Sequence, residues 1–305
     1  MKSLITTLGP IHLEKTGIIL PHEHVFTDLR NWKAAGYAEA RMKDVIRLMK
    51  PELERAKDSG ISAIVESTPI GVGRRAGILK AVSQAANFPL LVPTGVYREP
   101  WLPDWAADAS IDELCEWMTY ELTVEIEKSG VQAAWIKLSA GDDGMTKNEA
   151  KVLQAAAIAG SQTNAVIGSH TIRGSVVRTQ LDLIEKSGYA ANRFIWIHAQ
   201  AEPDFNLHIE MARRGAWIEY DSIGNPKQDG ICLDFIVKMV ESGFGDQILM
   251  SQDRGWYDPA KPYGGSPLPY TYLCETFLPM LVNVGMDEDL IRKLTAVNPF
   301  NAFAR

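Results

Sequence analysis

The feature of this sequence that most constrains its fold is a regular alternation of short apolar runs with stretches of helical spacing. Eight runs have the length and the β-branched or apolar content of buried strands, and each precedes a helical stretch. The runs are GIILPHEH, SAIVEST, PLLVPTGVY, AWIKLSA, AVIGSHT, FIWIHA, AWIEYDSI and QILMSQD. Strands that alternate with helices predict an all-parallel sheet, and near-continuous apolar character is what burial of both sheet faces requires.

The helical stretches share apolar positions at steps of three and four residues. In the first of them, Gly60 stands where a helix would end, and the apolar residues are Met42, Val45, Ile46, Met49, Leu53 and Ala56. Comparable patterns cover residues 111–128, 147–159, 176–186, 205–213 and 233–241. The tail, 271–305, is expected to form the eighth helix and a closing segment.

Eight strands and eight helices predict an α/β fold, a (β/α)8 TIM barrel that forms a single domain over residues 1–305. The alternative is an open doubly wound sheet, which would carry a glycine-rich phosphate loop after an early strand. The first apolar run ends instead in PHEHVFTDL, which has no such loop. The sequence therefore favours the closed barrel.

Composition narrows the partners of this chain. Its formal charge is −7, and no block of Lys and Arg would follow a phosphate backbone, so we expect a small-molecule substrate and no nucleic acid. No apolar run reaches the length of a membrane span, so no membrane partner is expected. Cys115, Cys232 and Cys274 form no CxxC pattern, and with no recognisable secretory signal they predict a cytoplasmic protein. A homodimer is compatible with these features.

Polar and ionisable residues stand at the carboxyl ends of the apolar runs, where barrel enzymes place their active sites. Residues two apart in a strand point to the same side, so His22 and His24 should both face inward while Glu23 faces the helical layer. The complete set is His22, His24, Lys137, His170, His198 and Asp253. Imidazole and carboxylate are ligands that zinc, manganese, iron and cobalt take, so the set predicts a metal site.

Lys137 is the most informative of these residues. Its ammonium group, in the middle of AWIKLSA, would be buried and repelled by neighbouring cations. Burial and nearby metal ions lower the pKa of such an amine, which can then be neutral and nucleophilic. A neutral amine can take up CO2 to form a carbamate, an anion with one oxygen for each of two metals. The alternative is a lysine whose amine reaches a carboxylate at the barrel mouth.

This arrangement resembles the phosphotriesterase family of the amidohydrolase superfamily. The matching segments are LPHEHVFTDL, VPTGVY, AWIKLSA, GSHT, WIHAQ, SQDRG and NPFNAFA, which span nearly the whole chain in the family's order. The resemblance implies two divalent metal ions, with zinc expected and manganese, cobalt or iron as alternatives. One ion would be held by His22, His24 and Asp253 and the other by His170 and His198, with carboxylated Lys137 and a hydroxide bridging them.

The implied chemistry is hydrolysis by attack of the bridging hydroxide on a carbonyl or phosphoryl centre. Asp253 would accept the proton of the nucleophile and help to deliver it to the leaving group. Three further residues are candidate substrate contacts. Tyr97 matches a tyrosine of the family's lactonases, with packing at the barrel rim as the alternative. Arg254 could bind a substrate anion or support Asp253, with a structural ion pair as the alternative. Trp256 and Tyr257 are the pocket candidates of a long Pro- and Gly-rich loop, although each is expected rather to pack that loop.

Other loop residues bear on the substrate. Trp101 and Trp105 could face this loop, although each is expected rather to pack the loop that carries it. Family lactonases often have an arginine in the loop after strand seven, where this chain has Asn225 and Lys227, so a preference for acyl-homoserine lactones is not expected. His12 and His208 lie outside the strand ends and are predicted to be structural or superficial.

The sequence thus predicts a two-metal hydrolase of lactones or related carboxylic esters, with phosphotriester cleavage as a side activity. An amide or a phosphorylated sugar lactone is the nearest alternative substrate. A one-metal deaminase is a second alternative, which Lys137 argues against. A non-catalytic binding barrel is a third, whose usual sign would be a missing ligand, and all six ligand positions are present.

Overall fold

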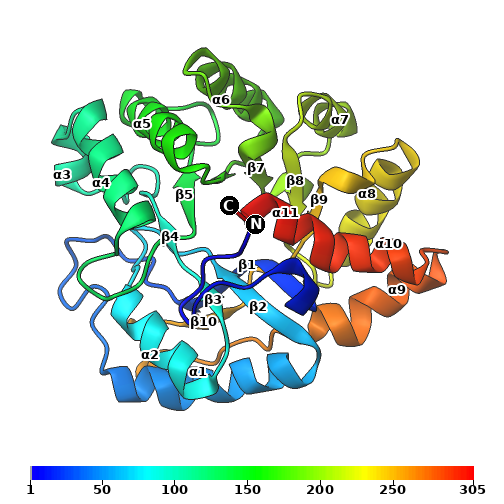
Figure 1. Cartoon of the computed structure of the whole chain (residues 1–305), viewed down its shortest axis with the longest axis horizontal. Helices are drawn as coiled ribbons and strands as arrows, with labels where there is room; N and C mark the ends of the chain where they lie inside the picture. Colours follow the sequence, from blue (N-terminus) through cyan, green and yellow to red (C-terminus); the bar gives the residue numbers. More distant parts are fainter. Residues whose placement is uncertain (1) are drawn as a thin grey trace.

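Parallel strands form a closed barrel inside a ring of helices in the computed structural model, which describes residues 2–305 (Figure 1). The strands are β1 (Ile18–Phe26), β2 (Ile61–Glu66), β3 (Leu90–Leu91), β4 (Pro93–Thr94), β5 (Trp135–Ser139), β6 (Ile167–His170), β7 (Phe194–Ile197), β8 (Trp217–Tyr220), β9 (Ile248–Met250) and β10 (Gly255–Tyr257). They pair in the orders β10-β1-β2-β3 and β4-β5-β6-β7-β8-β9. This is the predicted (β/α)8 architecture, and the open doubly wound sheet is excluded.

The helices follow the strands along the chain. They are α1 (Met42–Asp58), α2 (Ala76–Ala86), α3 (Asp104–Asp108), α4 (Ile111–Thr123), α5 (Lys147–Thr163), α6 (Gly174–Lys186), α7 (Phe205–Arg213), α8 (Asp229–Glu241), α9 (Leu278–Asn283), α10 (Glu288–Arg292) and α11 (Asn298–Phe303). Side chains at steps of three and four residues bury the inner face of α1. Capping boxes that start at Ser110 and Thr146 fix the beginnings of α4 and α5. No helix of residues 2–305 has the length and apolar character to cross a membrane.

The barrel closes between its last and first strands through single backbone hydrogen bonds rather than a regular ladder. The amide of Asp253 donates to the carbonyl of His22 at 3.2 Å, and the amide of His24 donates to the carbonyl of Arg254 at 2.9 Å. Strand β10 then pairs with the end of β1. The segment after β9 is therefore fixed against the carboxyl end of β1.

The core has two layers. Apolar side chains fill the space between strands and helices, and a second cluster fills the inside of the barrel away from the strands' carboxyl ends. The second cluster includes Leu4, Trp135 and Phe303. The two ends of the chain meet there, because Ser3 and Arg305 exchange backbone hydrogen bonds of 3.2 and 3.1 Å (Figure 1). The opposite end of the barrel is left for polar residues.

Four details differ from the sequence-based prediction. The third strand is interrupted at Val92, so it appears as β3 and β4. The helix expected over 111–128 ends at Thr123, because Val124 leaves the helical conformation with φ −120° and ψ −86°. The positive φ angles of Glu127 and Lys128 keep the helix from resuming. Strand β10 was not predicted. The tail contains three short α-helices and two π-helical turns, Leu273–Phe277 and Lys293–Val297, rather than one helix and a closing segment.

His208 is a buried structural residue on α7, as the sequence predicted. Its Nδ1 lies 2.9 Å from the hydroxyl of Tyr220 and its Nε2 lies 2.9 Å from the carbonyl oxygen of Glu202, so the neutral ring has both nitrogens satisfied. Burial lowers the pKa of His208 to about 4. The unfolded chain, with an ordinary histidine pKa near 6.5, therefore takes up this proton first as the pH falls.

We expect this histidine to make the fold sensitive to acid. Its contribution to the free energy of unfolding is complete above about pH 6.5 and is lost as the pH falls towards 4. Urea unfolding at about pH 7.5 and pH 4.5 should show the stability difference between wild type and His208→Gln shrinking by about 2 kcal/mol at the lower pH. A difference that stays constant between the two pH values would contradict this reading of His208.

Candidate metal centre

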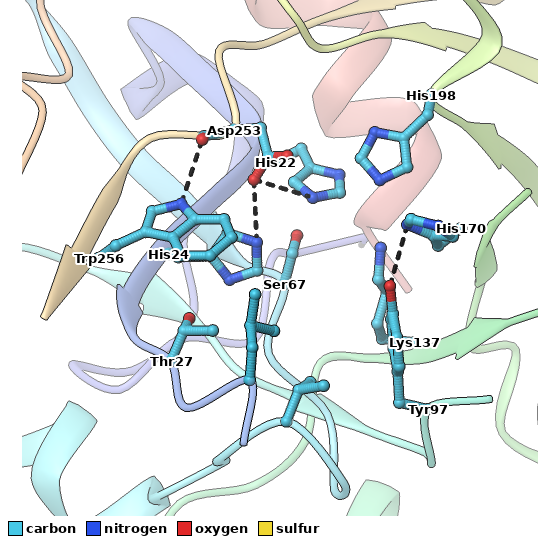
Figure 2. A pocket seen from close by; sticks show the side chains of 12 residues that line it. His22, His24, Thr27, Ser67, Tyr97, Lys137, His170, His198, Asp253 and Trp256 are labelled. Carbon is cyan, nitrogen blue, oxygen red and sulfur yellow. Dashed lines mark hydrogen bonds and ion pairs between the residues drawn. The ribbon is translucent and has the colours of Figure 1, made fainter. Parts of the chain in front are cut away.

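Six side chains from the carboxyl ends of the strands line one cavity of about 190 Å³ (Figure 2). They are the six residues that the sequence singled out, His22, His24, Lys137, His170, His198 and Asp253. Tyr97, Ser67, Thr27 and Trp256 line the same cavity, together with the apolar side chains of Leu29 and Val72. Residues more than 200 positions apart in the sequence thus converge at one end of the barrel.

An irregularity in β1 turns its two histidines into the cavity. The register between β1 and β2 shifts between Leu20 and Glu23, so the side chains that face the barrel axis change from the odd-numbered Ile19 to the even-numbered His22 and His24. The two imidazole centroids lie 5.5 Å apart. Strand alternation then keeps both rings on the same side, as predicted.

Left-handed backbone turns bring two further residues into the cavity. His198 has a φ of 64° and Asp253 a φ of 51°, a region that residues with a Cβ rarely occupy. His198 directly follows Ile197, which already faces the barrel interior, so regular alternation would direct the histidine outward. The positive φ reverses that direction. Backbone strain of this kind is concentrated at functional sites.

Each of three histidines has its Nδ1 occupied by a neighbouring oxygen at 2.7 Å. The partners are Glu219 Oε1 for His22, Thr68 Oγ1 for His24 and Asp221 Oδ1 for His198. This leaves Nε2 of each ring for another ligand. A metal-binding histidine is oriented in this manner by a hydrogen bond from its other ring nitrogen.

The donor atoms fit a metal ion. Oδ1 of Asp253 is buried and has no hydrogen-bond partner, and it lies 3.1 Å from Nε2 of His24 and 3.9 Å from Nε2 of His22. Two ligands of a tetrahedral zinc ion lie about 3.3 Å apart. His22, His198 and Asp253 also offer ligand atoms within 4.8 Å of one another. These residues could therefore hold a divalent cation.

Glu219 and Asp221 form a second cluster with His22, and the ligand atoms of these three residues also lie within 4.8 Å of one another. These carboxylates already bind the Nδ1 atoms of His22 and His198. A cation at that point would displace the bonds that orient the two rings. We therefore assign Glu219 and Asp221 to holding the histidines rather than to holding an ion.

Lys137 extends from β5 into the cavity and is 2% exposed. Burial lowers the pKa of Lys137 to about 8, although the carboxylates of Glu219, Asp221 and Asp253 oppose the shift. Its backbone touches that of Gly95, where a Cβ would collide with the lysine carbonyl and where φ is +107°. Glycine at this position therefore allows the third strand to approach β5 beside the lysine.

The histidines differ in their preferred charge. Burial, together with nearby cationic groups, holds the pKa of His22 and of His170 well below the usual value. Burial also acts against the charged form of His24, but the carboxylates of Asp253 and Glu66 outweigh it and raise the pKa of His24 to about 9. Neutral His22 and His170 are in the form that a metal ion requires.

Two of the three predicted substrate contacts lie at the cavity. The hydroxyl of Tyr97 is 3.2 Å from Nδ1 of His170. Trp256 stands edge-on to His24 with ring centroids 4.9 Å apart, and its indole N–H donates to the carbonyl of Asp253 at 3.1 Å (Figure 2). Both side chains therefore touch residues of the centre as well as the open space beside them.

Arg254 is placed differently. Its guanidinium group hydrogen-bonds the carbonyl of Gly224 and lies 4.8 Å from the ring centre of Tyr272. It does not line the cavity of the six residues. The arginine links the loop after β8 to the segment after β9, which matches the structural alternative considered from the sequence, although through a carbonyl and a ring rather than through an ion pair.

Comparison with known proteins agrees with this geometry. A model of the phosphotriesterase family matches residues 2–303. The chain belongs to the phosphotriesterase family. The phosphotriesterase homology protein of Escherichia coli (strain K12) is 26% identical over 95% of this chain and 99% of its own. The aryldialkylphosphatase of Saccharolobus solfataricus is 24% identical over 96% of this chain and 97% of its own.

Solved structures give the same result. A mutant of a phosphotriesterase-like lactonase from Deinococcus radiodurans is 26% identical and has a TM-score of 0.88, covering 99% of this chain and 100% of its own. The protein is therefore an enzyme, a metal-dependent hydrolase of the phosphotriesterase family with the family's barrel fold. Hydrolases of this kind act on small molecules, as the composition predicted.

The remaining loop aromatics of this phosphotriesterase-family enzyme lie outside the cavity. Tyr257 stacks on Phe26 with ring centroids 5.6 Å apart. Trp101 donates to the carbonyl of Leu29 and stands edge-on to Tyr97. Trp105 packs on another tryptophan, Trp117. All three side chains pack the loops, which was the expectation for each of them.

Sequence reasoning missed the residues that orient the histidines. Glu219 and Asp221 are fully buried, and Thr68 follows β2. A signal for the first two was present, because Glu and Asp stand two apart in the apolar run AWIEYDSI, the same spacing that identified His22 and His24. Thr68 carries no such signal, since a threonine at a strand end is common.

Proposed function

We propose that this enzyme hydrolyses a lactone or a related carboxylic ester at a two-metal centre, with zinc as the expected metal. One ion would be held by His22, His24 and Asp253, and the other by His170 and His198. Lys137, carboxylated by CO2, would contribute one oxygen to each ion. The observation that carries the proposal is the convergence of four imidazoles, a carboxylate and a buried lysine on one cavity.

Bound at this centre, two divalent ions would lower the pKa of a water molecule to about 7 and polarise the substrate's oxygen. The chain's own residues supply the rest. Asp253 has a free buried oxygen on the cavity side and can accept the proton of the attacking water. Its pKa is held below the ordinary value, because His24 outweighs the opposing effect of burial, so Asp253 is ionised and ready to accept that proton at neutral pH.

Tyr97 and Trp256 would orient the substrate. The Tyr97 hydroxyl reaches the cavity beside His170, and burial raises its pKa to about 12, so it stays protonated and can donate a hydrogen bond to a substrate oxygen. Trp256, Leu29 and Val72 present apolar surface on the same cavity. A polar reacting group at the metals and an apolar remainder against these side chains would suit an ester or lactone.

The names of relatives support both chemistries. A related barrel is described as a lactonase and another relative as an aryldialkylphosphatase. We propose the carboxylic ester as the principal substrate and the phosphotriester as a side activity. Asn225 and Lys227, the residues of the loop after β8, are exposed and do not line the cavity, which agrees with a substrate other than an acyl-homoserine lactone.

A substrate panel tests this function. Purified enzyme with its metal content measured should hydrolyse at least one simple γ- or δ-lactone with a kcat/KM in the ordinary range, about 10⁴ M⁻¹s⁻¹ or more, and an aryl phosphotriester at least about 10²-fold less well. A larger kcat/KM on amides or phosphorylated sugar lactones would move the assignment to those substrates. Deamination with one bound metal, or binding without turnover, would replace the proposed reaction altogether.

A further inference from the structure

The side chain between the two histidines of β1 has a role of its own. We infer that Glu23 is a positioning residue that sets the geometry of the first metal site by holding both backbone neighbours of Asp253. The inference rests on the proposed function, because it concerns the site formed by His22, His24 and Asp253. It assigns a task to a buried carboxylate that the hydrolytic mechanism itself does not use.

Both oxygens of Glu23 are occupied by the segment that follows β9. Oε1 accepts the hydroxyl of Ser251 at 2.8 Å and the amide of Gln252 at 3.0 Å. Oε2 accepts the amide of Arg254 at 2.7 Å. The side chain of Glu23 is fully buried, so no solvent competes for these bonds. The bonded amides lie immediately before and immediately after Asp253.

The conformation of Asp253 gives these bonds their importance. Its φ of 51° is in the left-handed region, which a residue with a Cβ leaves unless its surroundings hold it. The bond from the Arg254 amide to Glu23 fixes the peptide group that follows Asp253, and the bond from the Gln252 amide fixes the chain one peptide group before it. The peptide group between Gln252 and Asp253 is held by the bond from the Asp253 amide to the carbonyl of His22. With its backbone held in this way, Asp253 directs its carboxylate into the cavity, where Oδ1 lies 3.1 Å from Nε2 of His24.

The same segment is bound to the backbone of both histidines. The amide of His22 donates to Oγ of Ser251 at 2.9 Å, and the amide of Asp253 donates to the carbonyl of His22. The amide of His24 donates to the carbonyl of Arg254. Glu23 therefore sits at the centre of one hydrogen-bonded unit that contains all three ligands of the first ion, and the hydroxyl of Ser251 connects it to His22.

The chemistry of the contacts requires a carboxylate of this length. All three of the close partners are donors, so both side-chain oxygens must accept. A glutamine would turn an NH2 group towards one of these donors and lose at least one bond. An exchange of one oxygen for nitrogen at constant size should therefore loosen Asp253 without removing a metal ligand.

Metal affinity is the measurement that tests the inference. Zinc binding to the metal-free protein is measured by competition with a chromophoric chelator for wild type, Glu23→Gln and Glu149→Gln. Glu149 is a matched control, because it is also a buried glutamate that accepts two backbone amides, at Gly141 and Thr146, but away from the first site. Visible absorption of the cobalt-loaded proteins reports the coordination geometry independently of activity.

We expect Glu23→Gln to weaken one of the two zinc-binding steps by about 10- to 100-fold and to change the cobalt spectrum, while Glu149→Gln changes neither. Unchanged zinc affinity and cobalt spectrum in a folded Glu23→Gln protein would overturn the inference and leave the proposed function intact. Wild type that binds no zinc would instead overturn the proposed centre, and the inference with it.

Glu23→Asp provides the same test if Glu23→Gln does not fold. It keeps two accepting oxygens but shortens the side chain by one methylene, so the carboxylate cannot hold the amides of Gln252 and Arg254 at the same time. A zinc-binding step weakened by about threefold or more supports the inference. Affinity equal to wild type in Glu23→Asp counts against it.

Discussion

Lys137→Ala is expected to abolish the second metal and nearly all hydrolysis. Wild type should contain about two metal ions per chain, as two-metal hydrolases do, and the variant at most about one. The reason is that a carbamate on this lysine would be the only protein group that joins both ions. Loss of a centre that acts as a unit should lower kcat/KM by about 10³-fold or more. Elemental analysis of protein purified without chelator measures the first effect and lactone hydrolysis the second.

Lys151→Ala is the matched control for this experiment. Lys151 is a half-buried lysine whose ammonium group binds the backbone carbonyls of Ala107 and Ala109, and it does not line the cavity. Its removal should leave metal content and kcat/KM at the level of wild type. Two metals per chain in Lys137→Ala, with activity retained, would show that the lysine does not bridge the ions. The alternative, a lysine whose amine pairs with a carboxylate at the barrel mouth, would then be favoured.

Asp253→Asn is expected to damage the rate of reaction more than substrate binding. The amide keeps an oxygen for the metal but cannot accept the proton of the attacking water, and general base catalysis of this kind contributes about 10²- to 10⁴-fold to rate. We therefore expect kcat on a lactone to fall within that range and KM to change by less than about threefold. Steady-state kinetics on protein with verified metal content measures both.

The control for Asp253→Asn is Asp44→Asn, which replaces a carboxylate in the first turn of α1 that pairs with Arg41. This variant should have the kcat and KM of wild type. If Asp253→Asn changed KM strongly with little effect on kcat, Asp253 would serve substrate binding rather than proton transfer. Metal content measured on the same samples separates a lost proton acceptor from a lost ligand.

The sequence alone was sufficient for the fold class and for grouping the six side chains that line one cavity. The periods of strands and helices depend on local geometry, so they can be recognised in the sequence. A short run that is apolar at nearly every position, such as FIWIHA, is typical of a strand buried on both faces. A histidine, lysine or aspartate at the end of such a run is conspicuous because apolar strands exclude it elsewhere. Parallel strands in a barrel bring their carboxyl ends together. The sequence alone therefore predicts that polar residues at these ends lie close together, even where they are far apart along the chain.

The tertiary structure alone determined how the side chains of those residues are oriented in the cavity. Alternation places His22 and His24 on one side, which the sequence predicted to be the inner one, but the register shift in β1 that turns this side inward was not predicted. The positive φ of His198 and of Asp253 depends on neighbours distant in sequence, and so do the oxygens of Glu219 and Asp221 that orient two of the rings. The sequence thus determined which chemical groups reach the barrel mouth through local periodicity, whereas their geometry arises from long-range hydrogen bonds that no local pattern encodes.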